Sequence, residues 1–190
     1  MMNVLVTGGA GYIGSHVVEE LQKNGFTPIV YDNLSTGHAA AVPEEVQLVE
    51  GDIHDVAFLK HIMAQFEIDA VIHFAASSLV GESMENPSKY YFNNVEGSLH
   101  LLEAMKGAGV DYIVFSSTAA VYGEPESVPI KEDSCLKPTN VYGRTKLMIE
   151  KMLADYDMAY EMRYVELRDF IPQELRRAVI SVKTMILNRI

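Results

Sequence analysis

A tyrosine and a lysine four residues apart form the most reactive pair in the sequence. The segment Tyr142-Gly143-Arg144-Thr145-Lys146 follows the pattern Y-x-x-x-K. In a helix, positions i and i+4 lie on one face, a turn apart. A lysine ammonium beside a phenol favours the phenolate and lowers the pKa of the tyrosine, so the phenol can act as a base near neutral pH. We therefore predict that Tyr142 is a catalytic base whose pKa is lowered by Lys146.

Hydroxyl side chains follow a strand-like run further upstream. Ser116, Ser117 and Thr118 come directly after Tyr112 to Phe115. Hydroxyls at the carboxyl end of a strand can bind a substrate oxygen. The same residues also serve as caps and turn formers, and for Ser116 and Ser117 both interpretations stay open.

A glycine-rich segment near the start of the chain is suited to holding phosphates. The run T-G-G-A-G-Y-I-G, from Thr7 to Gly14, fits G-x-G-x-x-G through Gly9 and G-x-x-G-x-x-G through Gly8. Glycines allow a tight turn, approach of the backbone to a pyrophosphate and close packing of helix on strand. The start of the following helix favours negative charge. The sequence therefore predicts a dinucleotide site.

An acidic residue supports this prediction and indicates which dinucleotide is bound. Asp32 lies 18 positions after Gly14, at the end of the second predicted strand. A carboxylate there bonds the adenosine ribose hydroxyls and repels a 2′-phosphate. NADP enzymes usually place an arginine nearby, yet the first arginine in this chain is Arg144. We predict NAD rather than NADP.

Strand-like runs alternate with longer helical patterns, which is typical of a parallel α/β sheet. One helix carries Val95, Leu99, Leu102 and Met105 at helical spacing, and we expect them to form a buried face. The predicted fold is a Rossmann-like doubly wound parallel sheet flanked by helices. The predicted strands are 3–7, 28–31, 46–49, 70–74, 112–116 and 163–167, and the predicted helices are 13–24, 56–66, 90–108 and 141–159.

Composition excludes several classes of function. The formal net charge of −11 argues against a general nucleic-acid or anionic-membrane binder, because phosphates need a positive footprint. A single cysteine, Cys135, permits no intrachain disulfide and argues against a metal-thiolate cluster, so no metal is expected. No apolar run approaches the ~20 residues that span a bilayer, and the first residues do not resemble a signal peptide. A cytoplasmic protein is expected.

Taken in order, the motifs resemble one family. T-G-G-A-G-Y-I-G, Y-D-N-L, G-D-I, H-F-A-A, N-N-V, S-S-T-A-A-V-Y-G and Y-G-R-T-K-L-M-I-E occur between Met1 and about Phe170. This resembles the N-terminal half of the UDP-glucose 4-epimerase family, which belongs to the extended short-chain dehydrogenases/reductases. The resemblance implies that Tyr142 is the base, that Lys146 binds the nicotinamide ribose, and that Thr118 bonds the substrate. It implies an NAD site lined by Gly8, Gly11, Tyr12, Ile13, Gly14, Asp32, Asn33, Asp52, Ile53, Phe74, Ala75, Asn93, Ser116, Tyr142 and Lys146.

The resemblance also implies a reaction and an assembly. In the family, tyrosine takes the proton of the sugar 4-hydroxyl while a hydride passes to NAD, and the hydride returns to the other face of the rotated 4-keto sugar. Nucleotide-sugar dehydratases need an acidic pair after the threonine, whereas Thr118 here precedes Ala119-Ala120. By analogy with the family, the helices at 90–108 and 141–159 pair across a two-fold axis, so we expect a homodimer. Two alternatives are an NAD-dependent oxidoreductase acting on small carbonyl or alcohol substrates, and a non-catalytic NAD-binding protein.

The last twenty residues differ in composition from the rest. Residues 1–170 contain 11 Lys and Arg against 25 Asp and Glu, whereas residues 171–190 contain four against one. Back-translation in a shifted frame permits a reading that starts F-N-S-A-G-A-A-P-S-G-D-I-G-E-D-H, which resembles the family's own continuation. We therefore predict an NAD-binding domain at 1–170 and a non-family tail at 171–190 created by a single-nucleotide deletion. The sugar-nucleotide domain would be missing, and UDP-sugar binding and epimerase activity would be weak.

Overall fold

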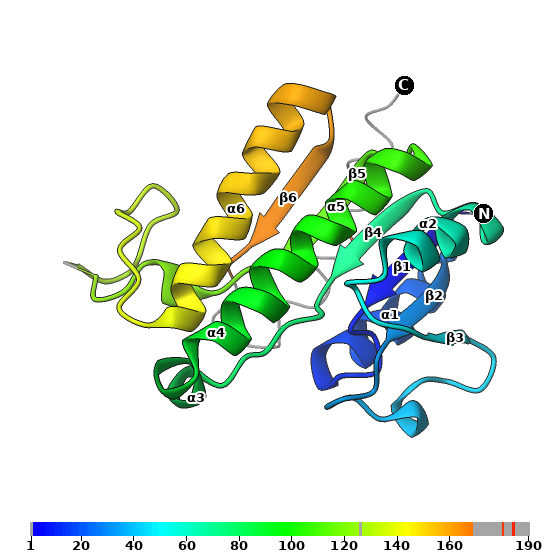
Figure 1. Cartoon of the computed structure of the whole chain (residues 1–190), viewed down its shortest axis with the longest axis horizontal. Helices are drawn as coiled ribbons and strands as arrows, with labels where there is room; N and C mark the ends of the chain where they lie inside the picture. The colour runs from blue at the N-terminus through cyan, green and yellow to red at the C-terminus, as the bar shows by residue number, and fades with distance from the viewer. Residues whose placement is uncertain (1, 126, 169–179, 181–183, 185–190) are drawn as a thin grey trace.

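The computed structural model describes residues 2–125, 127–168, 180 and 184. Within them, one parallel sheet has the strand order β3-β2-β1-β4-β5-β6 (Figure 1). This confirms the predicted doubly wound parallel sheet flanked by helices. The strands are β1 (Asn3–Thr7), β2 (Thr27–Asp32), β3 (Gln47–Glu50), β4 (Ala70–His73), β5 (Tyr112–Ser116) and β6 (Arg163–Leu167).

The predicted helices are all present, and two short helices, α3 and α4, precede the third of them. The short helix α3 was not predicted, because six residues carry too little periodicity to detect. The predicted helix at 90–108 is divided into α-helical and π-helical parts. The helices are α1 (Tyr12–Lys23), α2 (Val56–Gln65), α3 (Val80–Glu85), α4 (Pro87–Tyr90), the π-helix η2 (Tyr91–Glu96), α5 (Gly97–Ala108) and α6 (Val141–Tyr160), with 3-10 turns η1 (Ala39–Ala41) and η3 (Ala119–Val121).

Each face of the sheet has its own hydrophobic core. Successive residues of a strand point to opposite faces, so Leu5 of β1 joins a cluster with α2, α5 and α6. Val4 and Val6 join a second cluster with α1. In Figure 1, α5 and α6 run side by side in front of β4 to β6. From β1, the chain builds the sheet first toward β3 and then toward β6, so the order reverses between β1 and β4. In such sheets the ligand crevice lies at this point, at the carboxyl ends of the strands.

One prediction of a buried face is wrong in part. Leu102 and Met105 are buried, but Leu99 is 40% exposed. The buried positions of α5 include Ser98 and Leu101 instead. The π-helical segment η2 holds more residues in each turn than an α-helix does. Leu99, Leu102 and Met105 all lie in the regular helix α5, however, where the buried face is centred near Ser98, Leu101 and Met105, so Leu99 falls outside it.

The predicted tail at 171–190 lies outside the described residues apart from positions 180 and 184, both of which are exposed. Its origin and the domain boundary at 170 therefore stay predictions. Among the residues that the structure describes, no helix has the length and apolar character needed to cross a membrane.

Candidate functional site: the carboxyl edge of the sheet

The glycine loop between β1 and α1 is built by close backbone approach. Gly8 has φ +74°, and a Cβ atom added there would lie 2.5 Å from the backbone nitrogen of Ala75. A Cβ on Gly14 would collide with the carbonyl oxygen of Gly8. Gly11 caps α1 without any side-chain hydrogen bond. The first amides of α1 therefore open onto a cradle that side chains would fill, which is the geometry that a diphosphate needs.

Acidic and amide side chains extend this edge across β2 and β3. Asp32, only 8% exposed, accepts hydrogen bonds from the backbone nitrogens of Ala10 (3.0 Å) and Leu34 (2.9 Å). The Asn33 amide donates to Asp52 Oδ2 at 3.0 Å. The glycine loop and the ends of β2 and β3 are thus tied together. An ionised carboxylate has about four acceptor sites, so Asp32 keeps capacity for ribose hydroxyls.

The Asp52 carboxylate is held in its ionised form. Burial raises the pKa of Asp52, but hydrogen bonds from Asn33 and His54 outweigh this effect and lower the pKa overall. Its neighbour Ile53 is buried and lies where a Cβ on Gly97 would touch it. The predicted site residues Asp52 and Ile53, which follow β3, therefore lie next to the start of α5.

The end of β4 meets the glycine loop from the other side. The backbone nitrogens of Phe74 and Ala75 both donate to the carbonyl oxygen of Thr7, at 2.9 and 3.1 Å. Both side chains are partly buried, as is that of Asn93, whose amide donates to Asn94 Oδ1 at 2.9 Å. Phe74 and Ala75 therefore lie beside the glycine loop, and Asn93 lies next to Asn94 of η2. Tyr12 differs, because it is 70% exposed on the first turn of α1.

Sequence reasoning missed Asn94, which joins three elements. This fully buried amide accepts from the backbone nitrogen of Ser77 (2.8 Å) and donates to the Ser77 carbonyl (3.0 Å) and to Thr145 Oγ1 (3.2 Å). It therefore fixes the loop after β4 against η2 and α6. Its place beside Asn93 in the N-N-V motif was the available signal.

The predicted reactive residues come together at the end of β5. Tyr142 and Lys146 share one face of α6, with Lys146 Nζ 5.9 Å from the centroid of the Tyr142 ring. Thr118 caps η3, accepts from the Ala120 nitrogen at 3.2 Å and is hydrogen-bonded to the Tyr142 side chain. The Tyr142 ring thus lies near both the Thr118 hydroxyl and the Lys146 side chain at the end of β5.

Lys146 is buried with one hydrogen bond given to a carbonyl. It is 3% exposed, donates to the Ser116 carbonyl oxygen at 2.7 Å and lies 4.7 Å from the centroid of the Phe115 ring. Burial lowers the pKa of Lys146 to about 7, against the opposing effect of Glu150. The ammonium is therefore poised to gain or lose its proton near neutral pH.

The predicted effect of Lys146 on Tyr142 is wrong for this structure. Burial raises the pKa of Tyr142, and the hydrogen bond with Thr118 offsets only part of the increase. The Lys146 ammonium is directed to Ser116 instead of the phenol oxygen. The i, i+4 spacing correctly placed the two residues on one face, but it could not show where the ammonium points.

The two serines of this segment have different roles. Ser116 contributes its backbone carbonyl to Lys146. Ser117 is 5% exposed, and its hydroxyl donates to the buried carboxylate of Glu150. The alternative that the Ser117 hydroxyl binds substrate is therefore contradicted, because that hydroxyl is already used inside the fold.

Two further buried groups support the site and were not predicted. The His73 ring bridges Thr7 Oγ1 (2.7 Å) and Ser98 Oγ (2.9 Å), which joins β1 to α5, and burial lowers the pKa of His73 to about 3. Ser83 of α3 accepts from the Tyr142 nitrogen at 3.1 Å. Helix α3 therefore fixes the first turn of α6, which carries the phenol.

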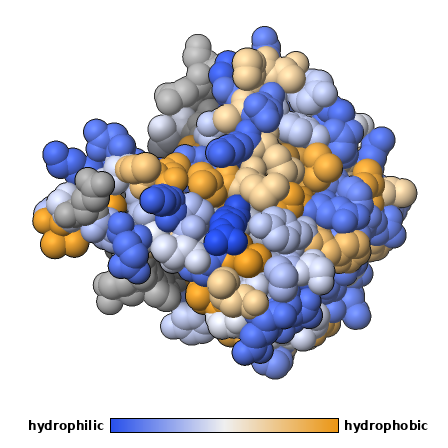
Figure 2. Space-filling view, turned by 60° about the vertical axis from the view of Figure 1, so that its left-hand side comes forward, coloured by the Kyte–Doolittle hydropathy of each residue, from blue (hydrophilic) through white to orange (hydrophobic). Residues whose placement is uncertain are grey.

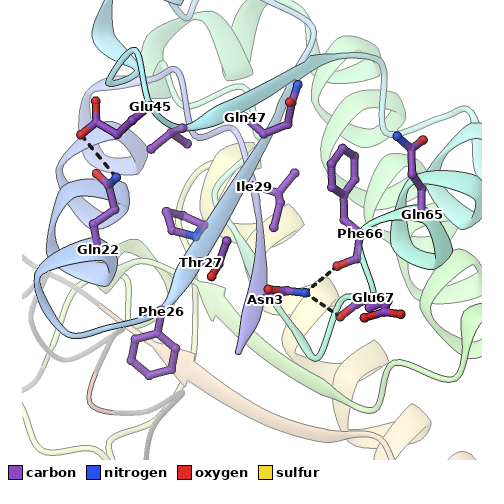
Figure 3. A pocket seen from close by; sticks show the side chains of 12 residues that line it. Asn3, Gln22, Phe26, Thr27, Ile29, Glu45, Gln47, Gln65, Phe66 and Glu67 are labelled. Atoms are coloured by element: carbon purple, nitrogen blue, oxygen red, sulfur yellow. Dashed lines mark hydrogen bonds between the residues drawn. The ribbon is translucent and has the colours of Figure 1, made fainter. Parts of the chain in front are cut away.

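The hollow drawn in Figure 3 lies at the opposite edge of the sheet. It has a volume of about 470 Å³ and is lined by the amino-terminal ends of β1 to β3, including Asn3 and Thr27. Its polar groups bond within the protein, as when the Asn3 amide donates to the Phe66 carbonyl at 2.8 Å and Gln22 donates to Glu45 at 3.4 Å. No predicted site residue lines it. Within the described residues, no three His, Cys, Asp or Glu side chains are grouped to hold a metal.

Known proteins are similar to this chain in sequence and in fold. A UDP-glucose 4-epimerase from Lactobacillus helveticus is 53% identical over 169 residues, which are 89% of this chain and 51% of that protein. The crystal structure of UDP-glucose 4-epimerase from Brucella ovis in complex with NAD is 54% identical with a TM-score of 0.86, covering 88% of this chain and 51% of that one. The Bifidobacterium longum enzyme, in complex with NAD+ and UDP, is 39% identical with a TM-score of 0.84, covering 88% and 52%.

These matches confirm the resemblance that the motifs indicated. The chain spans about half the length of the curated relatives that it matches. The model of the NAD dependent epimerase/dehydratase family matches residues 4–171. The chain therefore belongs to the NAD dependent epimerase/dehydratase family.

Proposed function

We propose that this chain binds NAD along the carboxyl edge of its sheet and carries the proton- and hydride-transfer site of a UDP-glucose 4-epimerase. One observation carries the proposal: the uncapped start of α1 and the side chains of Tyr142 and Thr118 open at the same edge. The relatives from Brucella ovis and Bifidobacterium longum, which have the same fold, were crystallised with this cofactor.

Different residues at this edge would bind different parts of NAD. The amides after Gly11 would hold the diphosphate, Asp32 would accept hydrogen bonds from the adenosine ribose hydroxyls, and Lys146 would bind the nicotinamide ribose. The cradle fits the group, because the volume that side chains at Gly8 and Gly14 would occupy is free of them. Bound NAD would supply the hydride acceptor and a cationic ring whose charge favours the phenolate of Tyr142.

Tyr142 acts as the proton acceptor for the substrate. Its phenol oxygen takes the proton of the sugar 4-hydroxyl while a hydride leaves carbon 4, and the product is a 4-keto sugar. The hydrogen bond with Thr118 already favours the phenolate and places a second hydroxyl near the sugar oxygen. Carbon 4 would be inverted when the hydride returns to the opposite face of carbon 4 in the rotated sugar and Tyr142 returns the proton to the C4 oxygen.

A single-turnover experiment with Tyr142→Phe tests this proposal. Purified chain is mixed with NAD and UDP-galactose, and the absorbance of reduced nicotinamide is followed. We expect a slow signal in the wild type and a rate lower by about 100-fold or more in Tyr142→Phe, the usual size of general acid–base catalysis. Affinity for NADH should not change. Equal rates in the two proteins would exclude Tyr142 as the base. Weak turnover of UDP-sugars by the chain alone stays a prediction.

A homodimer is part of the proposal. Phe92 of η2, Leu99 of α5 and Met148 of α6 are 56%, 40% and 43% exposed, although all three are apolar. Figure 2, which turns the left-hand side of Figure 1 forward, shows apolar side chains gathered near the middle of that face. Exposed apolar patches of this kind mark interfaces, and a second copy of the chain is the expected partner. Light scattering should give the mass of a dimer, and Phe92→Glu with Leu99→Glu should give a monomer. A monomeric wild type would remove this part of the proposal.

We infer that the protein is located in a reducing compartment, the cytoplasm. The sequence has one cysteine, and Cys135 is an exposed free thiol. Proteins of oxidising compartments more often pair their cysteines in disulfides. Localisation of a fluorescently tagged chain tests this inference, and accumulation outside the cytoplasm would contradict it.

A further inference from the structure

The end of β5 is held by two consecutive turns of α6. Lys146 donates to the Ser116 carbonyl oxygen at 2.7 Å, and the next residue, Ser117, donates its hydroxyl to Glu150 Oε1. Lys146 and Glu150 are four residues apart and therefore lie on one face of the helix. All three polar side chains are at most 5% exposed. Lys146 and Glu150 thus hold two successive residues at the end of β5, and we call this arrangement the clasp.

Arg168 locks this clasp from the end of β6. Its guanidinium donates to both Glu150 oxygens, from Nε at 3.0 Å and from Nη2 at 2.8 Å. Such a two-pronged pair fixes orientation as well as distance. Arg168 Nη2 also donates to Glu166 at 2.7 Å, and the guanidinium lies 5.4 Å from the centroid of the Tyr122 ring. The Ser117 nitrogen donates to the Leu167 carbonyl at 2.9 Å, so β6 is also hydrogen-bonded to the segment that follows β5.

We propose that Glu150 is a positioning residue: fixed by Arg168, its carboxylate holds the β5 end through Ser117 and keeps the Lys146 ammonium at the nicotinamide end of the crevice. Thr118, which is hydrogen-bonded to Tyr142, directly follows Ser117. The clasp therefore also orients the Thr118 hydroxyl, which is expected to bind the substrate. This inference deepens the proposed function and rests on it for the part that Lys146 plays toward NAD.

The charges around Lys146 support this role. On α6, Glu150 faces it one turn on and the neutral Tyr142 ring lies one turn back. The Phe115 ring of β5 lies beside the Lys146 ammonium. His73 of β4 is also close enough that the charge of Lys146 lowers the pKa of His73. Burial lowers the pKa of Lys146 and the negative charge of Glu150 raises it. Glu150 therefore favours the protonated form of the buried amine.

Titration of Lys146 in the absence of nucleotide tests the inference. The full chain is labelled with carbon-13 lysine, and the Lys146 signal is assigned by its loss in Lys146→Arg. Three proteins are compared: the wild type, Glu150→Gln and Glu166→Gln. Glu166 is the matched control, because it also binds Arg168 but does not bond Ser117. We expect Glu150→Gln to lower the pKa of Lys146 by about one unit, the low end of the effect of a nearby opposite charge. Glu166→Gln should leave it at the wild-type value.

Two results would overturn the inference: a wild-type pKa of Lys146 in Glu150→Gln, or an equal shift in both variants. If Glu150→Gln does not fold, Glu150→Gln with Arg168→Gln is titrated instead, since it does not leave the Arg168 guanidinium without its Glu150 partner. A lowered pKa of Lys146 in this double variant supports the inference, and an unchanged one contradicts it. Because no NAD is present, a failure here is separate from a failure of the chain to bind NAD.

Discussion

The two halves of the crevice are built by different means. On the side of β1 to β3, the site is made by backbone: glycines without side chains, amides at the start of α1 and one carboxylate that organises the loop. On the side of β4 to β6, it is made by buried side chains such as His73, Lys146 and Glu150. A diphosphate needs many fixed donors, which the backbone supplies, whereas proton transfer needs groups whose pKa depends on burial. The first half should therefore be sensitive to added volume and the second to pH.

The largest expected effect is the loss of folding stability at low pH that is caused by the buried His73. Its pKa is about 3 in the folded protein, below the ordinary value of 6.5. As pH falls from 6.5 to 3, the unfolded chain takes up a proton that the folded chain does not, so stability falls across this window. We expect a loss on the order of 4 kcal/mol from this group. Urea unfolding at several pH values should show that His73→Gln, which cannot take up this proton, loses less stability toward acid.

The exposed His16 provides the control for this measurement. His16→Gln should reproduce the acid profile of the wild type. If His73→Gln and the wild type lost stability in parallel, the claim that a neutral buried imidazole supports the reactive half would be wrong.

The next effect tests the backbone half with added volume. Gly8→Ala places a methyl group against the Ala75 backbone at 2.5 Å, and Gly8 also has φ +74°. Gly25 has φ +81°, yet a Cβ there would have nothing within 4 Å. Both alanine variants should lose about 1 kcal/mol of stability from backbone strain. Only Gly8→Ala should also lose NADH affinity, by roughly 100-fold, as measured by fluorescence titration. Equal affinities in the two variants would contradict a backbone-built cradle.

A smaller effect concerns Lys146, whose buried ammonium lowers the stability of the fold but is expected to contribute to NADH binding. The pKa of Lys146 is about 7 in the folded protein and lies near 10.5 when the lysine is exposed. Between these values the unfolded chain holds a proton that the folded chain has released, so stability rises with pH. The wild type should gain about 2 kcal/mol between pH 7 and 9. Lys146→Met should show no such gain and should bind NADH more weakly.

Lys151→Met is the matched control, because Lys151 is exposed on the same helix. It should keep the pH dependence and the NADH affinity of the wild type. Chemical denaturation at each pH measures both variants, and a wild-type slope in Lys146→Met would show that the ammonium is not buried as described.

The smallest expected effect concerns the choice of dinucleotide. Asp32→Asn should weaken NAD binding by about tenfold, the loss of one charge-assisted hydrogen bond, and should reduce discrimination against NADP. Asp69 accepts a backbone hydrogen bond from Asn3 (2.9 Å) at the opposite edge of the sheet. Asp69→Asn should therefore leave both affinities unchanged. Calorimetric titrations with both dinucleotides measure the ratio, and unchanged discrimination in Asp32→Asn would remove Asp32 from the ribose site.

The backbone half was readable from the sequence because its signals are local. Gly8 to Gly14 and Asp32 have fixed spacing along the chain, and the structure brings them together through Ala10. The reactive half was readable only in part. Tyr142 and Lys146 share a helical face as their spacing predicts, but the clasp of Ser117, Glu150 and Arg168 joins three elements that no local pattern connects. Leu99 was misplaced because an apolar residue can lie on the exposed side of a helix, and spacing alone does not show which side packs against the sheet.

Determination of a structure with NAD tests the central claim most directly. We predict that the diphosphate lies on the amides at the start of α1 and that the nicotinamide ring lies beside the Tyr142 phenol, with Lys146 on its ribose. No binding of NAD by the folded chain, or a Tyr142 side chain that points away from the nicotinamide, would contradict the account.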